Sequence, residues 1–369
     1  MNDLLLGCIQ CGRCTGGCPV STRSSLNIRK LIYHSLIKIK DKSKDLGMWE
    51  CTTCSTCSDR CPKGVKIVDY IITMRGDEIE RGKIQPTIRD TLESVLKFGN
   101  PWGRIREKRA EWMEDEGVRI LKPGESVEYL YFVGCTPCYE TRTQDLARSM
   151  VRVLKSISCD FAILGTKETC CGNEIKRMGE VGLFEILYEE NTKLFNQIKI
   201  GTLFTTSPHC FNTFKNEYPP LQFEIEHYTA IINKFIVNGK ITFQNDFERK
   251  VVFHDPCFLG KQNEIFEEPR EILRKVPGIT LVEYERSRER SLCCEGGGGR
   301  MWVESESDKE RLAVTRVKDA AGLGVDVIAT ACPFCLLTLE DAVKTTNLED
   351  TIKVMDIVEI VDEAVKTEE

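Results

Sequence analysis

The sequence predicts a multidomain α+β and α/β protein, in which an N-terminal α-helical domain precedes two tandem Rossmann-like α/β domains. Three observations lead to this prediction. Two runs of closely spaced cysteines near the N-terminus are each followed by apolar residues at helical spacing. From about residue 123, short apolar segments alternate with helical patterns, as in α/β units. These segments then recur once in the same order, so we expect domains at 1–122, 123–245 and 246–369.

Cysteine is the outlying residue, with 19 in a chain of 369. Disulfide-rich proteins are usually small and secreted. This chain is long, its first residues lack the pattern of a secretion signal, and no apolar run approaches the roughly 20 residues of a membrane helix. We therefore expect a cytoplasmic protein, held at a membrane only through a partner subunit, whose clustered cysteines bind metal.

The net charge of −6 is unevenly distributed. Residues 1–122 carry 22 Lys and Arg against 16 Asp and Glu, and the remainder carries 29 against 41. A basic domain beside an acidic body suits the docking of a redox partner, although an ordinary solvated surface has the same composition. The basic stretch at 104–109 matches no nucleic-acid-binding motif, so we expect no nucleic acid partner.

The N-terminal domain contains the runs Cys-x2-Cys-x2-Cys-x3-Cys-Pro at 8–19 and again at 51–62. Three thiolates at this spacing reach three irons of one [4Fe–4S] cubane, and the fourth cysteine ligates the other cluster. The predicted ligands are Cys8, Cys11, Cys14 and Cys61 for the first cubane, and Cys51, Cys54, Cys57 and Cys18 for the second. Zinc sites instead pair two Cys-x2-Cys knuckles.

Helical periodicity covers residues 26–37 and 68–79, and the helix between the two cysteine runs favours a helical ferredoxin domain over a compact β-containing one. A Gly/Pro-rich stretch at 99–103 ends this domain, and the charged segment 104–122 links it to the rest. In the remainder, strands are expected at 128–133, 161–164, 202–205, 250–253, 280–284 and 325–330, and helices at 142–155, 269–276 and 306–321.

Cysteines mark the internal repeat. Each copy contains three landmarks in the same order: a lone cysteine, a Cys-Cys pair, and a final motif that reads Ser-x2-Cys in the first copy and Cys-x2-Cys in the second. The offsets between the two copies are 122, 123 and 125 residues. The second copy offers Cys257, Cys293, Cys294, Cys332 and Cys335, one thiolate more than a cubane needs. Strand ends converge at one sheet edge, so we expect these thiolates to meet there. Gly296–Gly299 would let the backbone approach cluster sulfides; a phosphate cradle is the alternative, but its Gly-Lys-Ser/Thr spacing is absent.

This pattern, Cys-x34/35-Cys-Cys followed by Cys-x2-Cys, twice after a two-cubane domain, resembles the CCG-domain proteins. The whole chain resembles the D-type subunit of heterodisulfide reductase, which corresponds to a fusion of the C-type and B-type subunits. The resemblance implies a non-cubane [4Fe–4S] cluster in each CCG domain. It also implies that a disulfide such as that of coenzyme M and coenzyme B is cleaved between the two clusters.

The chain departs from the pattern of that family in three places. Ser207 stands where the second copy has Cys332, so the first copy offers Cys135, Cys170, Cys171 and Cys210, with Ser207 itself or the nearby Cys138 as a substitute ligand. A serine hydroxyl binds iron more weakly than a thiolate, so we expect one or two non-cubane clusters. Glu295 replaces the glycine of the second Cys-Cys-Gly motif, and Cys159, outside every motif, is expected in the core.

Other polar residues lie near these ligands in sequence. His254 and His209 are candidate proton donors to a leaving thiolate, with a structural hydrogen bond as the alternative. Lys261, Arg270 and Arg300 are candidates for binding an anionic substrate group, with ordinary surface placement as the alternative.

The primary functional hypothesis is an oxidoreductase subunit that passes electrons through two cubanes to a CCG cluster, which reduces a disulfide. No Gly-x-Gly-x-x-Gly follows a strand, so we expect no flavin or nicotinamide on this chain. Electrons must then come from a flavoprotein, a hydrogenase-type subunit or a membrane b-type cytochrome. The alternative hypothesis is a non-catalytic relay beside a lactate- or glycolate-type flavin oxidase, an electron-transferring flavoprotein or a quinone-linked membrane complex.

Overall fold

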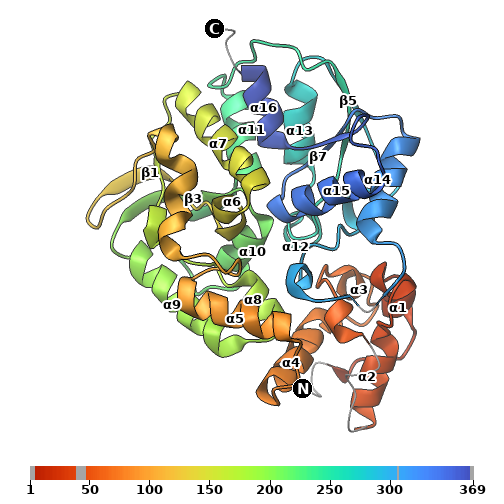
Figure 1. Ribbon diagram of the computed structural model, residues 1–369. Helices are drawn as coiled ribbons and strands as arrows, with labels where there is room; N and C mark the ends of the chain where they lie inside the picture. Colours follow the sequence, from red (N-terminus) through yellow and green to blue (C-terminus); the bar gives the residue numbers. More distant parts are fainter. Residues whose placement is uncertain (1–4, 39–46, 306, 366–369) are drawn as a thin grey trace.

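A computed structural model of the chain describes residues 5–38, 47–305 and 307–365. The N-terminal helical domain lies below two α/β domains that stand side by side, the first yellow to green and the second cyan to blue (Figure 1). We call the α/β domains copy one and copy two. Their parallel sheets confirm the predicted fold class of a helical domain followed by two α/β domains.

The N-terminal domain is built from short helices around the two cysteine runs. Its α-helices are α1 (Arg13–Gly16), α2 (Ile28–Leu36), α3 (Thr56–Asp59), α4 (Ile67–Glu80) and α5 (Pro86–Phe98). Asn27 caps α2 by accepting a hydrogen bond from the backbone N–H of Lys30. Helix α5 begins at Pro86 and ends before Gly99, whose φ of 69° suits a residue without a Cβ. The expected linker instead contains the 3-10 segment η4 (Arg106–Glu116), whose Arg109 and Trp112 are buried.

Copy one has a four-stranded parallel sheet in the order β2-β1-β3-β4. Its strands are β1 (Ser126–Tyr131), β2 (Phe161–Ala162), β3 (Lys199–Thr205) and β4 (Glu224–His227). Its helices are α6 (Cys135–Tyr139), α7 (Thr141–Ser156), α8 (Asn173–Met178), α9 (Val181–Phe195), α10 (Pro208–Asn216) and α11 (Tyr228–Val237).

Copy two repeats this topology in the order β6-β5-β7-β8. Its strands are β5 (Arg249–Phe253), β6 (Ile279–Val282), β7 (Val327–Thr330) and β8 (Lys353–Asp356). Its helices are α12 (Gly260–Asn263), α13 (Glu267–Lys275), α14 (Leu312–Gly322), α15 (Pro333–Thr345) and α16 (Ile357–Val365). The helix expected at 306–321 begins only at Leu312, and its first expected residue lies outside the described part of the chain.

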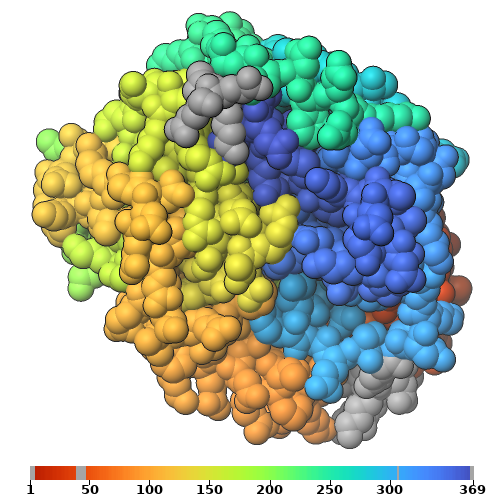
Figure 2. Space-filling model, turned by 45° about the horizontal axis from the view of Figure 1, so that its top comes forward, coloured from red at the N-terminus to blue at the C-terminus, as the bar shows by residue number. Residues whose placement is uncertain are grey.

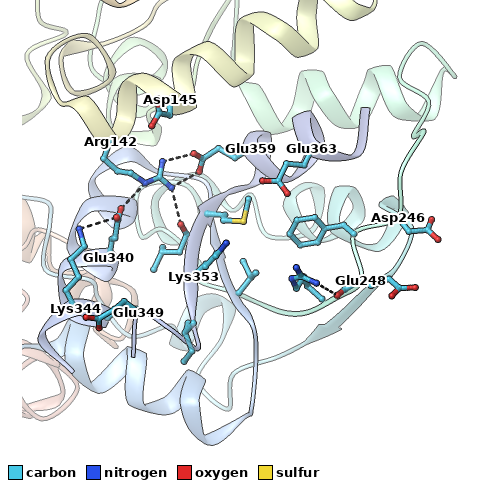
Figure 3. A pocket seen from close by; sticks show the side chains of 17 residues that line it. Arg142, Asp145, Asp246, Glu248, Glu340, Lys344, Glu349, Lys353, Glu359 and Glu363 are labelled. Carbon is cyan, nitrogen blue, oxygen red and sulfur yellow. Dashed lines mark hydrogen bonds and ion pairs between the residues drawn. The ribbon is translucent and has the colours of Figure 1, made fainter. Parts of the chain in front are cut away.

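The two copies are packed against each other through α7 and α16. Figure 2 shows the yellow surface of copy one meeting the dark blue surface of copy two. Arg142 of α7 reaches across to Glu359 at 2.6 Å and Glu340 at 2.9 Å, in a pocket lined by both copies (Figure 3). No cysteine is among the described residues that line this pocket, so it serves the domain junction rather than a cluster.

Candidate iron–sulfur sites

The first predicted cubane ligands line one pocket at the edge of the N-terminal domain. The pocket brings Cys61 of the second run to Cys8, Cys11 and Cys14 of the first. Cys11 is the one exposed cysteine in the described part of the chain. The backbone N–H of Val65 donates to Cys61 Sγ at 3.4 Å. Four thiols around one pocket fit a four-iron cluster with a crossed fourth ligand.

The second predicted set lies deeper. Cys18, Cys51, Cys54 and Cys57 are all buried in one core cluster. Burial raises the pKa of Cys51 to about 12, and burial followed by neighbouring thiols raises the pKa of Cys57 well above its usual value. Such thiols become thiolates only against a strong positive charge, which a cluster iron would supply.

Four cysteines of copy one form a continuous buried row. Side-chain contacts join Cys135 to Cys170, Cys170 to Cys171, and Cys171 to Cys210. They come from the start of α6, the loop before α8 and the first turn of α10. Gly134 has a φ of 83°, and a Cβ there would lie 3.4 Å from Cys210 Sγ, so the glycine keeps the site open.

Arg109 is a site residue that sequence reasoning missed. Its two terminal nitrogens lie 3.7 and 3.8 Å from Cys135 Sγ, and its guanidinium pairs with Glu168 at 2.5 Å. Both side chains are 1% exposed, and Glu168 also accepts hydrogen bonds from the backbone N–H groups of Val133 and Gly134. The buried pair fixes the loop that presents Cys135.

The other thiols and the serine of copy one have separate surroundings. Ser207 is the N-cap of α10, and its hydroxyl accepts the backbone N–H of Cys210 at 3.5 Å. Cys138 packs with Trp112 in a core cluster separate from that of the cysteine row. Cys159 is half-buried against the same core as Cys138, and burial raises its pKa to about 11. Ser207 therefore bonds a member of the row, Cys138 influences Cys135 only through charge, and Cys159 packs in the other core cluster.

All five predicted cysteines of copy two meet at the carboxyl edge of its sheet. The Sγ atoms of Cys294 and Cys335 lie 3.1 Å apart, and Cys257 contacts Cys293. Burial opposes ionisation of Cys332, but hydrogen bonds from Cys335 and His209 outweigh it and lower the Cys332 pKa to about 5. At the position equivalent to Ser207, Cys332 makes no cap hydrogen bond with its own side chain. The lowered pKa favours the thiolate form of Cys332, which is the form that binds iron.

The two candidate histidines have opposite electrostatics. His254 lies with Cys294 and Cys335 in a group whose ligand atoms are within 4.8 Å of one another. Burial, then the charge of Arg316, lowers the His254 pKa to about 3. His209 Nδ1 lies 2.8 Å from Glu174, and its ring reaches Cys332 of the other copy. Burial lowers the His209 pKa, but Cys332 and Glu174 outweigh it and raise the value to about 10, so of the two histidines only His209 is positively charged at neutral pH.

The three candidate cations near copy two are held by the protein. Arg270 is fully buried between Asp255 and Glu283, which contradicts the alternative of surface placement for this residue. Arg300 pairs with Glu50 at 3.3 Å. Lys261 Nζ donates at 2.8 Å both to Thr56 Oγ1 and to the carbonyl of Ser291.

The second N-terminal site directly adjoins the copy-two site. The Cys54 and Cys293 thiols face each other, and their hydrogen bond is the largest influence raising the Cys54 pKa. Cys293 Sγ also lies 3.4 Å from Thr52 Oγ1. A Cβ at Gly298 would come within 2.6 Å of the Thr52 backbone, so the glycine run lets this loop pack against the second N-terminal site.

Glu295, which replaces the glycine of the Cys-Cys-Gly motif, stabilises the same contact between the N-terminal domain and copy two. Its φ is 67°, so its backbone keeps a conformation that glycine favours. Its buried carboxylate pairs with Arg23 of the N-terminal domain at 3.0 Å and accepts the backbone N–H of Leu312 at 2.9 Å. The substitution therefore adds a buried ion pair between the cubane domain and the Cys293–Cys294 loop.

Comparison with known proteins agrees with this arrangement. Residues 5–65 match the family of 4Fe-4S dicluster domains, and residues 129–215 and 251–340 each match the cysteine-rich domain family called CCG. A crystal structure of a hypothetical protein from Helicobacter pylori has the same fold, with a TM-score of 0.63 at 11% identity over 97% of this chain and 71% of that one. None of the helices in the described residues is long and apolar enough to cross a membrane.

The domains and the cysteines together place the chain among iron–sulfur proteins that join a 4Fe-4S dicluster domain to two CCG domains. The chain is a homologue of the D-type subunit of heterodisulfide reductase: it is 29% identical to the Methanosarcina barkeri protein over 97% of this chain and 93% of that one. It is 38% identical to "Probable iron-sulfur-binding oxidoreductase FadF" of Bacillus subtilis, over 89% of this chain, and 32% identical to EtfAB:quinone oxidoreductase of Syntrophomonas wolfei, over 85%. The chain spans about half the length of these last two, 48% and 46%.

Proposed function

We propose that this chain carries electrons one at a time through two cubanes into an iron–sulfur cluster bound by the five cysteines of copy two. The contact between Cys54 and Cys293 carries this proposal, because ligands of two successive sites touch there. The first and second N-terminal sites are also neighbours, since Cys14 contributes to the raised pKa of Cys57. Three sites thus follow one another from the exposed Cys11 inward.

We propose that the copy-two cluster reduces a disulfide, such as that of coenzyme M and coenzyme B. Two electrons and two protons convert one disulfide into two thiols, and the relay delivers the electrons in two steps. Cys257 is the partly exposed ligand of this set, which gives a substrate sulfur an approach. His209, protonated and in contact with Cys332, holds a proton at the site. Such a cluster supplies an iron that can bind sulfur.

A second candidate acceptor is a flavoprotein or quinone site on another subunit. The packing between the cysteine sets of copy one and copy two favours this second acceptor. The His209 ring stacks on Phe258 at 4.2 Å between centroids and meets Phe334 edge-on at 4.9 Å, and all three rings are buried. Because these buried rings pack against one another beside Cys332, they restrict the room for a disulfide held by both CCG sites at once. Under this alternative the copy-two cluster passes electrons onward without chemistry of its own.

Thiol release distinguishes the two acceptors. The cluster-loaded protein is reduced chemically under anaerobic conditions and mixed with the heterodisulfide of coenzyme M and coenzyme B or with simple dialkyl disulfides. Disulfide reduction predicts two thiols for every two electrons consumed. Release of no thiol from any of them, with electrons still passing to a quinone or flavoprotein, would establish the relay alternative.

We propose that the electron donor docks at the mouth of the first N-terminal site. Leu6 and Ile9 are 72% and 61% exposed, and Ile9 lines the pocket that contains Cys11. Three exposed cations, Arg13, Arg29 and Lys63, line the same pocket, and no acidic residue is among its described lining residues. An apolar centre with a basic rim fits an acidic one-electron carrier protein.

Charge reversal at this rim tests the docking proposal. With reduced flavodoxin as an acidic one-electron donor, Lys63→Glu combined with Arg29→Glu should slow cluster reduction about tenfold at low salt. Reduction by dithionite should change little, because a small reductant needs no docking face. Lys193→Glu, at an exposed position on α9 of copy one, is the matched control. The docking site would be contradicted if the control variant lost as much of its reduction rate. It would also be contradicted if the rate of reduction in wild type did not depend on ionic strength.

A further inference from the structure

Arg75 of α4 is a completely buried cation at the point where the three domains meet. Its exposed fraction is 0%. One terminal nitrogen donates to the carbonyls of Arg177 in copy one and Gly298 in copy two, each at 2.8 Å. The other donates to the carbonyls of Met48 at 2.9 Å and Cys51 at 2.6 Å in the N-terminal domain. One guanidinium therefore holds a backbone segment of every domain.

No carboxylate compensates this charge directly. Among the described residues, Arg75 forms no ion pair within 4.0 Å, and its Nε is buried without a hydrogen-bond partner. Burial lowers the Arg75 pKa to about 10, Arg300 and Arg177 oppose its charge, and the largest favourable influence is Cys51. A buried charge of this kind is costly unless an anion lies nearby.

We propose that Arg75 is the fixed counter-ion of the second N-terminal cluster and raises that cluster's reduction potential above that of the first. An all-thiolate cubane is a net anion and becomes more negative on reduction. A cation bonded to the Cys51 carbonyl in a dry junction therefore favours the reduced state. Cations at the first site, Arg13, Arg29 and Lys63, are exposed and screened by water. Electron transfer from the first cluster, near the surface, to the second cluster, in the interior, is then favourable in free energy. This inference rests on the proposed cluster assignment.

An EPR-monitored redox titration of the cluster-loaded protein tests the inference. At a potential where half of the second wild-type cluster is reduced, Arg75→Gln should lower its reduced fraction about tenfold and leave the first cluster nearly unchanged. Arg75→Lys keeps the positive charge but loses the two terminal nitrogens of the guanidinium. The potential of its second cluster should therefore stay near the wild-type value. Arg81→Gln, at the exposed C-terminal end of the same helix, is the matched control.

A purely structural Arg75 predicts a different pattern. Lysine would then behave like glutamine, with both variants losing iron or both keeping the wild-type potential, and either result overturns the proposal. An unshifted second cluster in a fully loaded Arg75→Gln protein overturns it too. These outcomes differ from failure of the proposed relay, because equilibrium potentials are measured whether or not electrons go on to copy two. Absence of a second cubane signal in wild type would instead reject the cluster assignment.

Discussion

Cys293→Ser is expected to stop electron delivery to copy two while both N-terminal clusters remain reducible. Cys293 is at once a proposed ligand of the copy-two cluster and the neighbour of Cys54 in the second cubane site. A serine hydroxyl is a weaker iron ligand, and the substitution removes the sulfur at the junction. EPR of the reduced variant should show the two N-terminal signals, and thiol release from a disulfide should fall at least about a hundredfold.

Cys159→Ser is the control for this substitution, because Cys159 is a half-buried thiol outside every cysteine set. It should keep the wild-type cluster content and rate. A Cys293→Ser protein that reduces its copy-two cluster as fast as wild type would show that electrons enter copy two elsewhere.

Cys61→Ala is expected to damage the first N-terminal cluster rather than the one built on its own cysteine run. The structure places Cys61 in the pocket of Cys8, Cys11 and Cys14, although Cys57 is only four residues away in sequence. Loss of one of four ligands should remove the cluster or convert it, with a loss of up to about four irons per chain.

Mössbauer and EPR spectra of Cys61→Ala, with iron analysis, show which cubane has changed. The second cluster has a separate set of four buried cysteines as its proposed ligands, so its spectroscopic signal should not change. Loss confined to the second cluster would reject the crossed ligation. Iron near eight per chain in wild type, with stoichiometric zinc, would reject the clusters of both CCG copies.

The grouping of the cysteines in space could be predicted, because cysteines that bind one cluster follow spacing rules that are visible in a linear sequence. The repeat was predictable for the same reason, and both copies have the same strand order. The edge strands β4 and β8 were missed, because each has four residues and mixes exposed with buried positions. Ser207 was recognised as a missing thiolate, but its role as the cap of α10 depends on local geometry.

The charged groups around the sites were not predictable. Arg75 bonds a carbonyl 102 residues away, and Arg109 bonds a carboxylate 59 residues away, in loops that only the folded chain brings together. The contact between Cys54 and Cys293 likewise depends on how two domains pack, which no spacing within either domain encodes. Lys261 and Arg300 were noticed as cations, but their bonds to the N-terminal domain had no sequence signal.

The central claim is that electrons reach copy two through the second N-terminal cluster. Rapid freeze-quench EPR of wild type and Cys57→Ala, after mixing with reduced flavodoxin, tests it most directly. Cys57 is a proposed ligand of the second site, where its charged neighbours are Cys51, Cys54 and Cys18. In wild type, the copy-two signal should follow those of the N-terminal clusters. In Cys57→Ala, the first cluster should still be reduced and the copy-two cluster should stay oxidised. Reduction of copy two at the wild-type rate in this variant would contradict the relay.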